Sequence, residues 1–336
     1  MKKTIALIYF ATEPADAAEK VIEAVSKKYR HDFSVKKIAV DKSDLTAAQM
    51  EKTVKTCLSC DAVIVAESPS SVSDKAVAKY LEKLILGIRN SLKLYTNIVP
   101  IKNYAEDNRI DVLCVMDCAG GIYNNESGIR RGKLGREAFD TECYSEIEIE
   151  RVSRIAFELS ENRSHKVLSV DKAELLSSSQ LWRTAISDVA SDYPDVVLNS
   201  VSIEDAIRKI NKNIDDLDVV VTTNLFGDIL ASLLASVSGS EEILPSCYLN
   251  DATLGLYLPY RGTENVGLIG YNSPLAAINS VSSALRYSFE LYNEAEAIDE
   301  AVKKIYLGKF STPDIAKKDD VVCSAERITE EVLKEI

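Results

Sequence analysis

Short apolar segments alternate with amphipathic ones along this chain, and no other feature limits its fold as strongly. Residues 4–10 and 61–67 are apolar runs of strand length, whereas residues 73–92 carry apolar side chains at helical spacing. The same criteria predict further strands at 33–40, 112–118, 165–172 and 218–224, and further helices at 16–29 and 46–59. Strand–helix alternation of this kind predicts an α/β fold with a large, mostly parallel sheet covered by helices.

Four polar side chains follow predicted strands at the point where each strand ends. They are Tyr123, Lys172, Asn224 and Asp228. Ligands of parallel sheets bind at the carboxyl ends of the strands. These four residues are therefore the first candidates for a functional site.

Charge and hydropathy exclude several classes of partner. The formal net charge is −12, which argues against nucleic acid or an anionic membrane as the main partner. No apolar run approaches the ~20 residues that span a bilayer, and the first residues do not read as a signal peptide. A cytoplasmic location with reduced cysteines is expected, and the lone pair Cys57 and Cys60 is interpreted as ordinary thiols.

Residues 119–144 interrupt the alternation. This polar segment holds five of the chain's 13 glycines. A loop of this length is usually functional, or it packs on another chain.

Several stretches together resemble the 3-isopropylmalate and isocitrate dehydrogenases, the β-decarboxylating dehydrogenase family. The stretches are "GGIYNNESG", "EAFDTECYSEIEIERVSRIAFELS", "HKVLSVDKAELLSSSQLWR", "DVVVTTNLFGDILASLLASVSGS" and, at 85–102, "ILGIRNSLKLYTNIVPIK". They occur in the family's order between about residues 81 and 290. The resemblance implies a two-domain subunit, with residues 1–100 plus 251–336 in one domain and 101–250 in the other. It also implies a homodimer in which the 119–144 arm crosses to the partner subunit.

The resemblance further implies an activity and its cofactors. The family oxidises a small 2-hydroxy acid with NAD or NADP and then decarboxylates it with Mg²⁺ or Mn²⁺. Tyr123 and Lys172 match its proton-handling residues, which come from opposite subunits. Arg89 matches one substrate-clamping arginine, and Asp228 matches one metal carboxylate. A further metal carboxylate, expected from the other subunit, matches Glu204 or Asp205, since "VSIEDA" allows either register. The cofactor-side positions that match are Asn224, Glu174, Arg261 and Asn272.

Other positions depart from the family pattern. The two remaining clamp arginines are replaced by Val99 and Met116, and the second metal carboxylate on the Asp228 helix is replaced by Ser232. On the cofactor side, the glycine-rich loop after the first strand has no glycine, "AESPSS" stands where a G-G-P loop is expected, Glu174 replaces an Asn, and Arg261 replaces a His.

Three interpretations follow from these matches and departures. The chain is an ordinary dehydrogenase of the family, a diverged dehydrogenase with another hydroxy acid and an anion site relocated to Arg130, Arg131 or Arg261, or a non-catalytic paralogue. A non-catalytic chain could serve as a regulatory subunit beside an intact family member. Because the departures affect the substrate, metal and cofactor sites together, they favour the third interpretation. The sequence leaves the substrate and the choice between NAD and NADP open.

Overall fold

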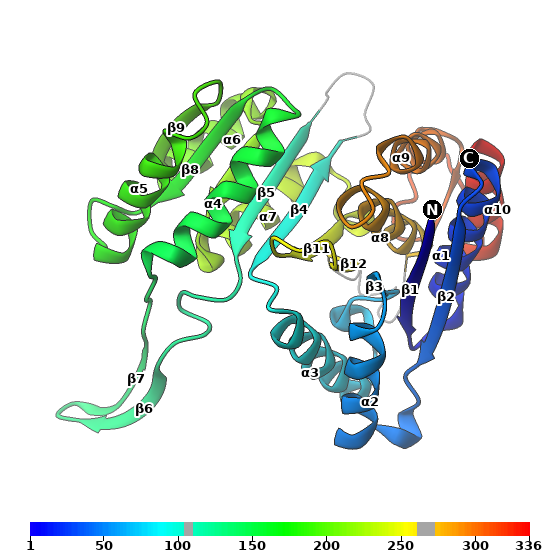
Figure 1. The fold of residues 1–336 in the computed structure, drawn as a ribbon, viewed down its shortest axis with the longest axis horizontal. Helices are drawn as coiled ribbons and strands as arrows, with labels where there is room; N and C mark the ends of the chain where they lie inside the picture. The colour runs from blue at the N-terminus through cyan, green and yellow to red at the C-terminus, as the bar shows by residue number, and fades with distance from the viewer. Residues whose placement is uncertain (104–109, 261–272) are drawn as a thin grey trace. The chain divides into compact units, whose positions relative to one another are not determined.

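The computed structural model describes residues 1–103, 110–260 and 273–336, and these residues form two compact units. One unit contains Met1–Leu94 and the described residues of Gly239–Ile336. The other contains Tyr95–Asn103 and residues 110–238. The predicted α/β class with a mixed, mostly parallel sheet is confirmed (Figure 1).

The first unit combines both ends of the chain. Its strands are β1 (Lys2–Tyr9), β2 (Asp32–Ala39), β3 (Ala62–Val65), β11 (Pro245–Leu249), β12 (Leu256–Pro259), and the short pair β13 (Phe310–Ser311) and β14 (Val321–Val322). Its helices are α1 (Thr12–Tyr29), α2 (Ala47–Leu58), α3 (Lys75–Leu92), α8 (Pro274–Tyr287), α9 (Tyr292–Leu307) and α10 (Ala325–Glu335). The main strand order is β2-β1-β3-β12-β11, parallel except for the β11–β12 pair.

The second unit carries most of the candidate site. Its strands are β4 (Thr96–Lys102), β5 (Asp111–Asp117), β6 (Ser127–Gly132), β7 (Gly135–Asp140), β8 (Lys166–Asp171), β9 (Val197–Ser202) and β10 (Val219–Thr222). Its helices are α4 (Glu146–Glu161), α5 (Ser177–Ala190), α6 (Ile203–Asn213) and α7 (Asn224–Ser238). The strand order is β4-β5-β10-β8-β9, parallel except for the β4–β5 pair.

Continuous apolar strands build the core of each unit. All four residues of β3 and of β10 are buried, as expected for parallel strands covered on both faces. Cys57 and Cys60 are buried in the first unit's core, and burial raises the pKa of the Cys57 thiol to about 12. In the described part of the chain, no helix combines the length and the apolar character needed to cross a bilayer.

The 119–144 segment is not the irregular loop that its composition predicts. Strands β6 and β7 pair antiparallel from Ser127↔Asp140 to Gly132↔Gly135 and form a β-hairpin. Figure 1 shows this hairpin extending away from the other elements of its unit. Its tip residue Leu134 is fully exposed, and Ile129 is 72% exposed. The glycine-rich composition did not predict this hairpin, because its strands are short and mostly polar.

Helix α4 begins at a reciprocal cap. The backbone N–H of Glu148 donates to Ser145 Oγ at 3.4 Å, and the Ser145 N–H donates back to Glu148 Oε2 at 2.8 Å. We expect Ser145→Ala to lower the free energy of unfolding by about 1 kcal/mol, because it removes the acceptor for the helix N-terminus. Urea denaturation checks this, with Ser145→Thr as the matched control that keeps a hydroxyl. Equal midpoints for the Ala and Thr variants would show that the cap contributes nothing.

Candidate functional site

Tyr123 and Asp228 form the central contact of the candidate site. Tyr123 lies in the loop after β5, and Asp228 lies near the N-terminus of α7, just past β10. The Tyr123 hydroxyl donates to Asp228 Oδ2 at 2.9 Å. Partial burial and this carboxylate raise the pKa of Tyr123 to about 12. Tyr123 is therefore protonated at neutral pH and is available as a proton donor.

Asp117 anchors the loop that carries Tyr123. It is the last residue of β5 and is fully buried. Its Oδ1 accepts the backbone N–H groups of Ala119 at 3.0 Å and Gly120 at 2.6 Å. Arg151 Nη2 lies 3.6 Å from Oδ2, and the guanidinium stacks on Tyr95 at 4.3 Å. Burial raises the pKa of Asp117, while the two N–H donors and Arg151 oppose that shift.

Gly121 allows the same loop to pack closely. Its φ is +69°, and a Cβ there would lie 2.1 Å from the Tyr144 hydroxyl. Asn224 holds the neighbouring backbone, because its Nδ2 donates to the Gly120 carbonyl at 2.8 Å. The side-chain oxygen of Asn224 accepts the Leu225 N–H at 2.9 Å. Asn224, which matches a cofactor-side position of the family, is therefore buried and helps to hold this loop.

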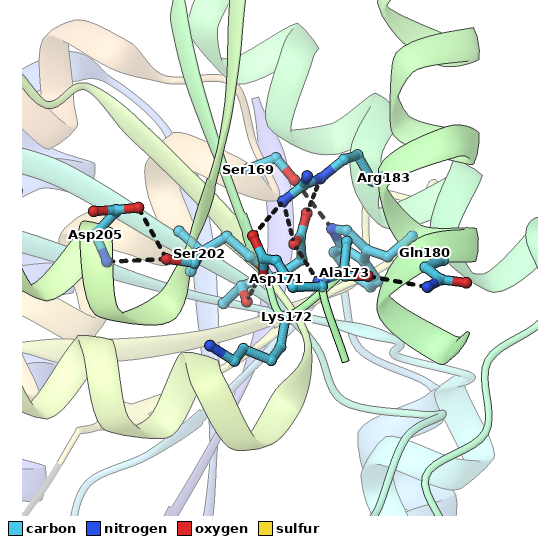
Figure 2. Close-up of polar contacts among 12 residues, drawn as sticks. Ser169, Asp171, Lys172, Ala173, Gln180, Arg183, Ser202 and Asp205 are labelled. Carbon is cyan, nitrogen blue, oxygen red and sulfur yellow. Dashed lines mark hydrogen bonds and ion pairs between the residues drawn. The ribbon is translucent and has the colours of Figure 1, made fainter. Parts of the chain in front are cut away.

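Lys172 and Glu204 form a second pair in the same unit. Lys172 directly follows β8, and its Nζ donates to Glu204 Oε1 in the first turn of α6. The ammonium group holds the pKa of Glu204 below its usual range. Asp205 has different partners: it accepts from Ser202 Oγ at 3.0 Å (Figure 2). It also pairs with Arg208. Glu204 and Asp205 are the two residues that could match the family's metal carboxylate. Of these two, Glu204 is the one that contacts Lys172.

The end of β8 is fixed by a buried carboxylate. Asp171 accepts two hydrogen bonds from Arg183, at 2.7 and 2.9 Å, and one from the Ala173 N–H at 2.9 Å (Figure 2). This bidentate geometry restricts the backbone on both sides of Lys172. Glu174 is exposed and lies 3.9 Å from the same Arg183. The Glu174 carboxylate therefore lies beside the Asp171–Arg183 ion pair.

The two apolar replacements lie inside the sheet. Val99 in β4 is fully buried, and Met116 in β5 is 2% exposed. Met116 Cβ lies 2.6 Å from the place that a Cβ on Gly227 would occupy, so this methionine packs directly under the start of α7. Arg89 lies on α3 in the other unit, with its guanidinium 4.5 Å from the centre of the Tyr248 ring. Arg261 and Asn272 lie outside the described residues.

The described residues of one chain do not fit a divalent cation. Hard cations require several oxygen ligands with negative charge. Asp228 shares its Oδ2 with Tyr123, and the next helical turn offers the hydroxyl of Ser232. Within the described ranges, no three or more His, Cys, Asp and Glu side chains gather as a metal site.

Glu67 is an important residue that the sequence interpretation missed. Its carboxylate is 0% exposed, and it accepts the N–H groups of Phe10 and Ala11, which precede helix α1. The available signal was a glutamate directly after the apolar strand β3, where a side chain is expected to be enclosed. This contact joins the two segments that lack the family's glycines, the turn after β1 and the turn after β3.

Known proteins resemble this chain over nearly its whole length. A sequence profile described as isocitrate/isopropylmalate dehydrogenase matches residues 11–335. The 3-isopropylmalate dehydrogenase of Halalkalibacterium halodurans is 34% identical, with 100% of this chain and 98% of that protein covered. The Bacillus subtilis 3-isopropylmalate dehydrogenase is also 34% identical, with 99% and 96% covered.

Solved structures share the fold at lower identity. The isocitrate dehydrogenase from Methylococcus capsulatus aligns with a TM-score of 0.79 at 22% identity, covering 99% of both chains. A β-decarboxylating dehydrogenase from Thermococcus kodakarensis aligns with a TM-score of 0.76 at 24% identity, covering 99% of this chain and 96% of that one. The profile and the relatives confirm the resemblance on which the motifs were matched. The chain belongs to the isocitrate/isopropylmalate dehydrogenase family.

Proposed function

We propose that the chain is a non-catalytic member of this family, which binds a small metabolite or a partner subunit without oxidising isopropylmalate or isocitrate. The observation that carries the proposal is the burial of Val99 and Met116 at two clamp positions. Neither side chain pairs with a carboxylate. Losing two charge-assisted pairs of ~1.5–3 kcal/mol each weakens binding of such a substrate by roughly two to four decades.

Departures on the metal and cofactor sides support the same conclusion. Ser232 supplies no charge beside Asp228, so the helix offers one carboxylate where the family pattern has two. Glu67 already occupies the backbone N–H groups of Phe10 and Ala11. A changed substrate alone would alter the clamp and leave the metal and cofactor sides intact, whereas here all three are altered.

The exposed β6–β7 hairpin supports an oligomeric form. Ile129 and Leu134 are apolar side chains that the single chain leaves exposed. A second chain that packs on this arm would remove them from water. We propose a homodimer, or a hetero-oligomer in which an intact paralogue supplies catalysis and this chain regulates it.

A second candidate function is favoured by the two intact polar pairs. Tyr123–Asp228 and Lys172–Glu204 provide a phenol and an amine of the kind that would serve a diverged NAD- or NADP-dependent dehydrogenase of another 2-hydroxy acid. A bound dinucleotide would accept the hydride. Tyr123 would donate a proton to the enolate, Lys172 would move the hydroxyl proton, and Arg89 would hold a single substrate carboxylate.

Calorimetric titration with NAD and NADP, with and without Mg²⁺, separates the two candidates. We expect no micromolar binding of either dinucleotide, because the altered loops and Glu67 leave few donors for a cofactor. Micromolar binding would overturn the non-catalytic proposal and favour the diverged dehydrogenase. In that case, steady-state dinucleotide reduction in a screen of 2-hydroxy acids must fall strongly in Tyr123→Phe, which keeps the ring and removes the hydroxyl that protonates the enolate.

A further inference from the structure

A groove lies along helix α6 in the second unit. It has a volume of about 460 Å³ and is bounded by residues of β8, β9 and α6 and by the short turn Ile214–Asp216. This volume falls within the range of small-molecule sites. Strand β9 ends the strand order of this unit, and Figure 1 shows it at the outer edge beside β8. The groove is therefore a concave face at an open sheet edge.

The groove is basic although the protein is acidic. Its lining includes Lys166 from the start of β8 and Lys209 and Lys212 from α6. In the described part of the chain, none of these three ammonium groups forms an ion pair or a side-chain hydrogen bond. The formal net charge of the whole chain is −12. A groove lined by three lysines without carboxylate partners therefore differs in charge from the chain as a whole.

Other charged residues of the lining are already paired. Arg208 is paired with Asp205. Asp218 is held by Arg163 Nε at 2.6 Å and by the Ser164 N–H at 2.9 Å. The remaining carboxylate is Asp216, which accepts a hydrogen bond from Asn213 Nδ2. After these pairs are set aside, the three lysines outnumber Asp216, which among the described residues has a neutral partner and no cationic one.

The three lysines come from both walls of the groove. Lys209 and Lys212 are three residues apart and lie on the same face of α6. Lys166 lies on the facing strand β8, and the apolar side chains of Leu168 and Val201 line the same groove. A lysine ammonium acts as a point charge with several donors and binds phosphate and carboxylate groups alike.

We propose that the groove between α6 and the β8–β9 edge is a binding site for a small multivalent anion, either a phosphate compound or a polycarboxylate. Lys166, Lys209 and Lys212 bind the charged groups, and the apolar floor receives the carbon part of the ligand. The site lies at the start of β8, whereas Lys172 follows the end of that strand. The proposal therefore stands independently of any role of Tyr123 or Lys172.

Calorimetric titration of the full-length protein tests this site, with inorganic pyrophosphate and tricarballylate as the two probes. We expect saturable binding of at least one probe, weakened by added salt. The probe that binds more tightly identifies the anion as phosphate or carboxylate in type. Absence of saturable binding of both probes at millimolar concentration would overturn the proposal.

Charge variants localise the binding. The double variant Lys209→Glu with Lys212→Glu is expected to weaken binding about tenfold or more, equivalent to ~1.4 kcal/mol. Asp216→Asn should tighten it, because it removes the repelling carboxylate. The control Lys79→Glu with Lys83→Glu makes the same charge change on exposed positions of α3 and should have a much smaller effect. Equal loss in the two double variants would assign the binding to overall charge and overturn the site.

Discussion

Asp117→Ala is expected to lower the free energy of unfolding by about 3 kcal/mol, since it removes a buried carboxylate on which several groups depend. The backbone N–H groups of Ala119 and Gly120 lose their acceptor, and the Arg151 guanidinium loses its carboxylate partner. The loop that carries Tyr123 should then become mobile. Hydrogen exchange checks this locally, because the amides of Ala119 and Gly120 should exchange much faster than those of β5.

Asp117→Asn is the matched control for this prediction. The amide oxygen keeps an acceptor for both N–H groups, while the charge facing Arg151 is removed. The N–H contacts are 2.6 and 3.0 Å long, whereas Arg151 lies 3.6 Å away. We therefore expect the Asn variant to lose only about 1 kcal/mol and to keep slow exchange at Gly120. If the two variants are equally destabilised, the ion pair and not the N–H contacts holds the loop.

The sequence predicts the main elements because their periodicity is local. Apolar runs identified β1, β2, β3, β5 and β8, and helical spacing identified α1, α2 and α3, with boundaries that differ from the structure by a few residues at most. The hairpin of residues 127–140 was not predicted. Its strands contain charged side chains on both faces, so they lack the alternation of apolar and polar residues that indicates a half-buried strand.

The candidate site is predictable only in part. Tyr123, Lys172 and Asp228 were selected because they follow strand ends, and the structure gives each of the three a partner in the same unit. Glu204 contacts Lys172 and Asp205 does not, because neighbouring residues on a helix point in directions about 100° apart. A one-residue register cannot be read from spacing in "VSIEDA".

Buried carboxylates are the part of the site that sequence reasoning misses. Glu67 and the Phe10 backbone are 57 residues apart in the chain. Their contact arises because β1 and β3 are adjacent parallel strands, so the turns that follow them meet at one edge. The position of Glu67 directly after an apolar strand hints at burial, but composition and periodicity do not identify its partner, and a glutamate in a turn is usually solvated.

Glu67 holds the turn that leads into helix α1. The N-cap residue Ala11 has no side chain that can accept a hydrogen bond. The Glu67 carboxylate accepts the backbone N–H groups of this turn, with Phe10 N–H at 3.1 Å from both oxygens and Ala11 N–H at 2.5 Å from Oε1. Burial nevertheless outweighs these donors and raises the pKa of Glu67 to about 7.

This raised pKa makes the stability of the protein depend on pH. The folded chain holds a proton on Glu67 up to about pH 7, whereas an unfolded glutamate releases it near 4.5. The folded state therefore binds more protons between these values, and the stabilising contribution present below pH 4.5 is lost as the pH rises through 7. The difference in unfolding free energy is about 3 kcal/mol across this window.

Glu67→Gln isolates this contribution from the other titrating groups. The Gln oxygen still accepts the Phe10 and Ala11 N–H groups, but the side chain does not ionise. Urea unfolding at pH 5 and pH 8 should show that the wild-type protein loses about 3 kcal/mol more than the variant on going to the higher pH. Groups common to both proteins cancel in this comparison. If the two proteins change in parallel, Glu67 is ionised in the folded state throughout the window, and the N–H donors of the β1–α1 turn stabilise its charge more strongly than burial opposes it.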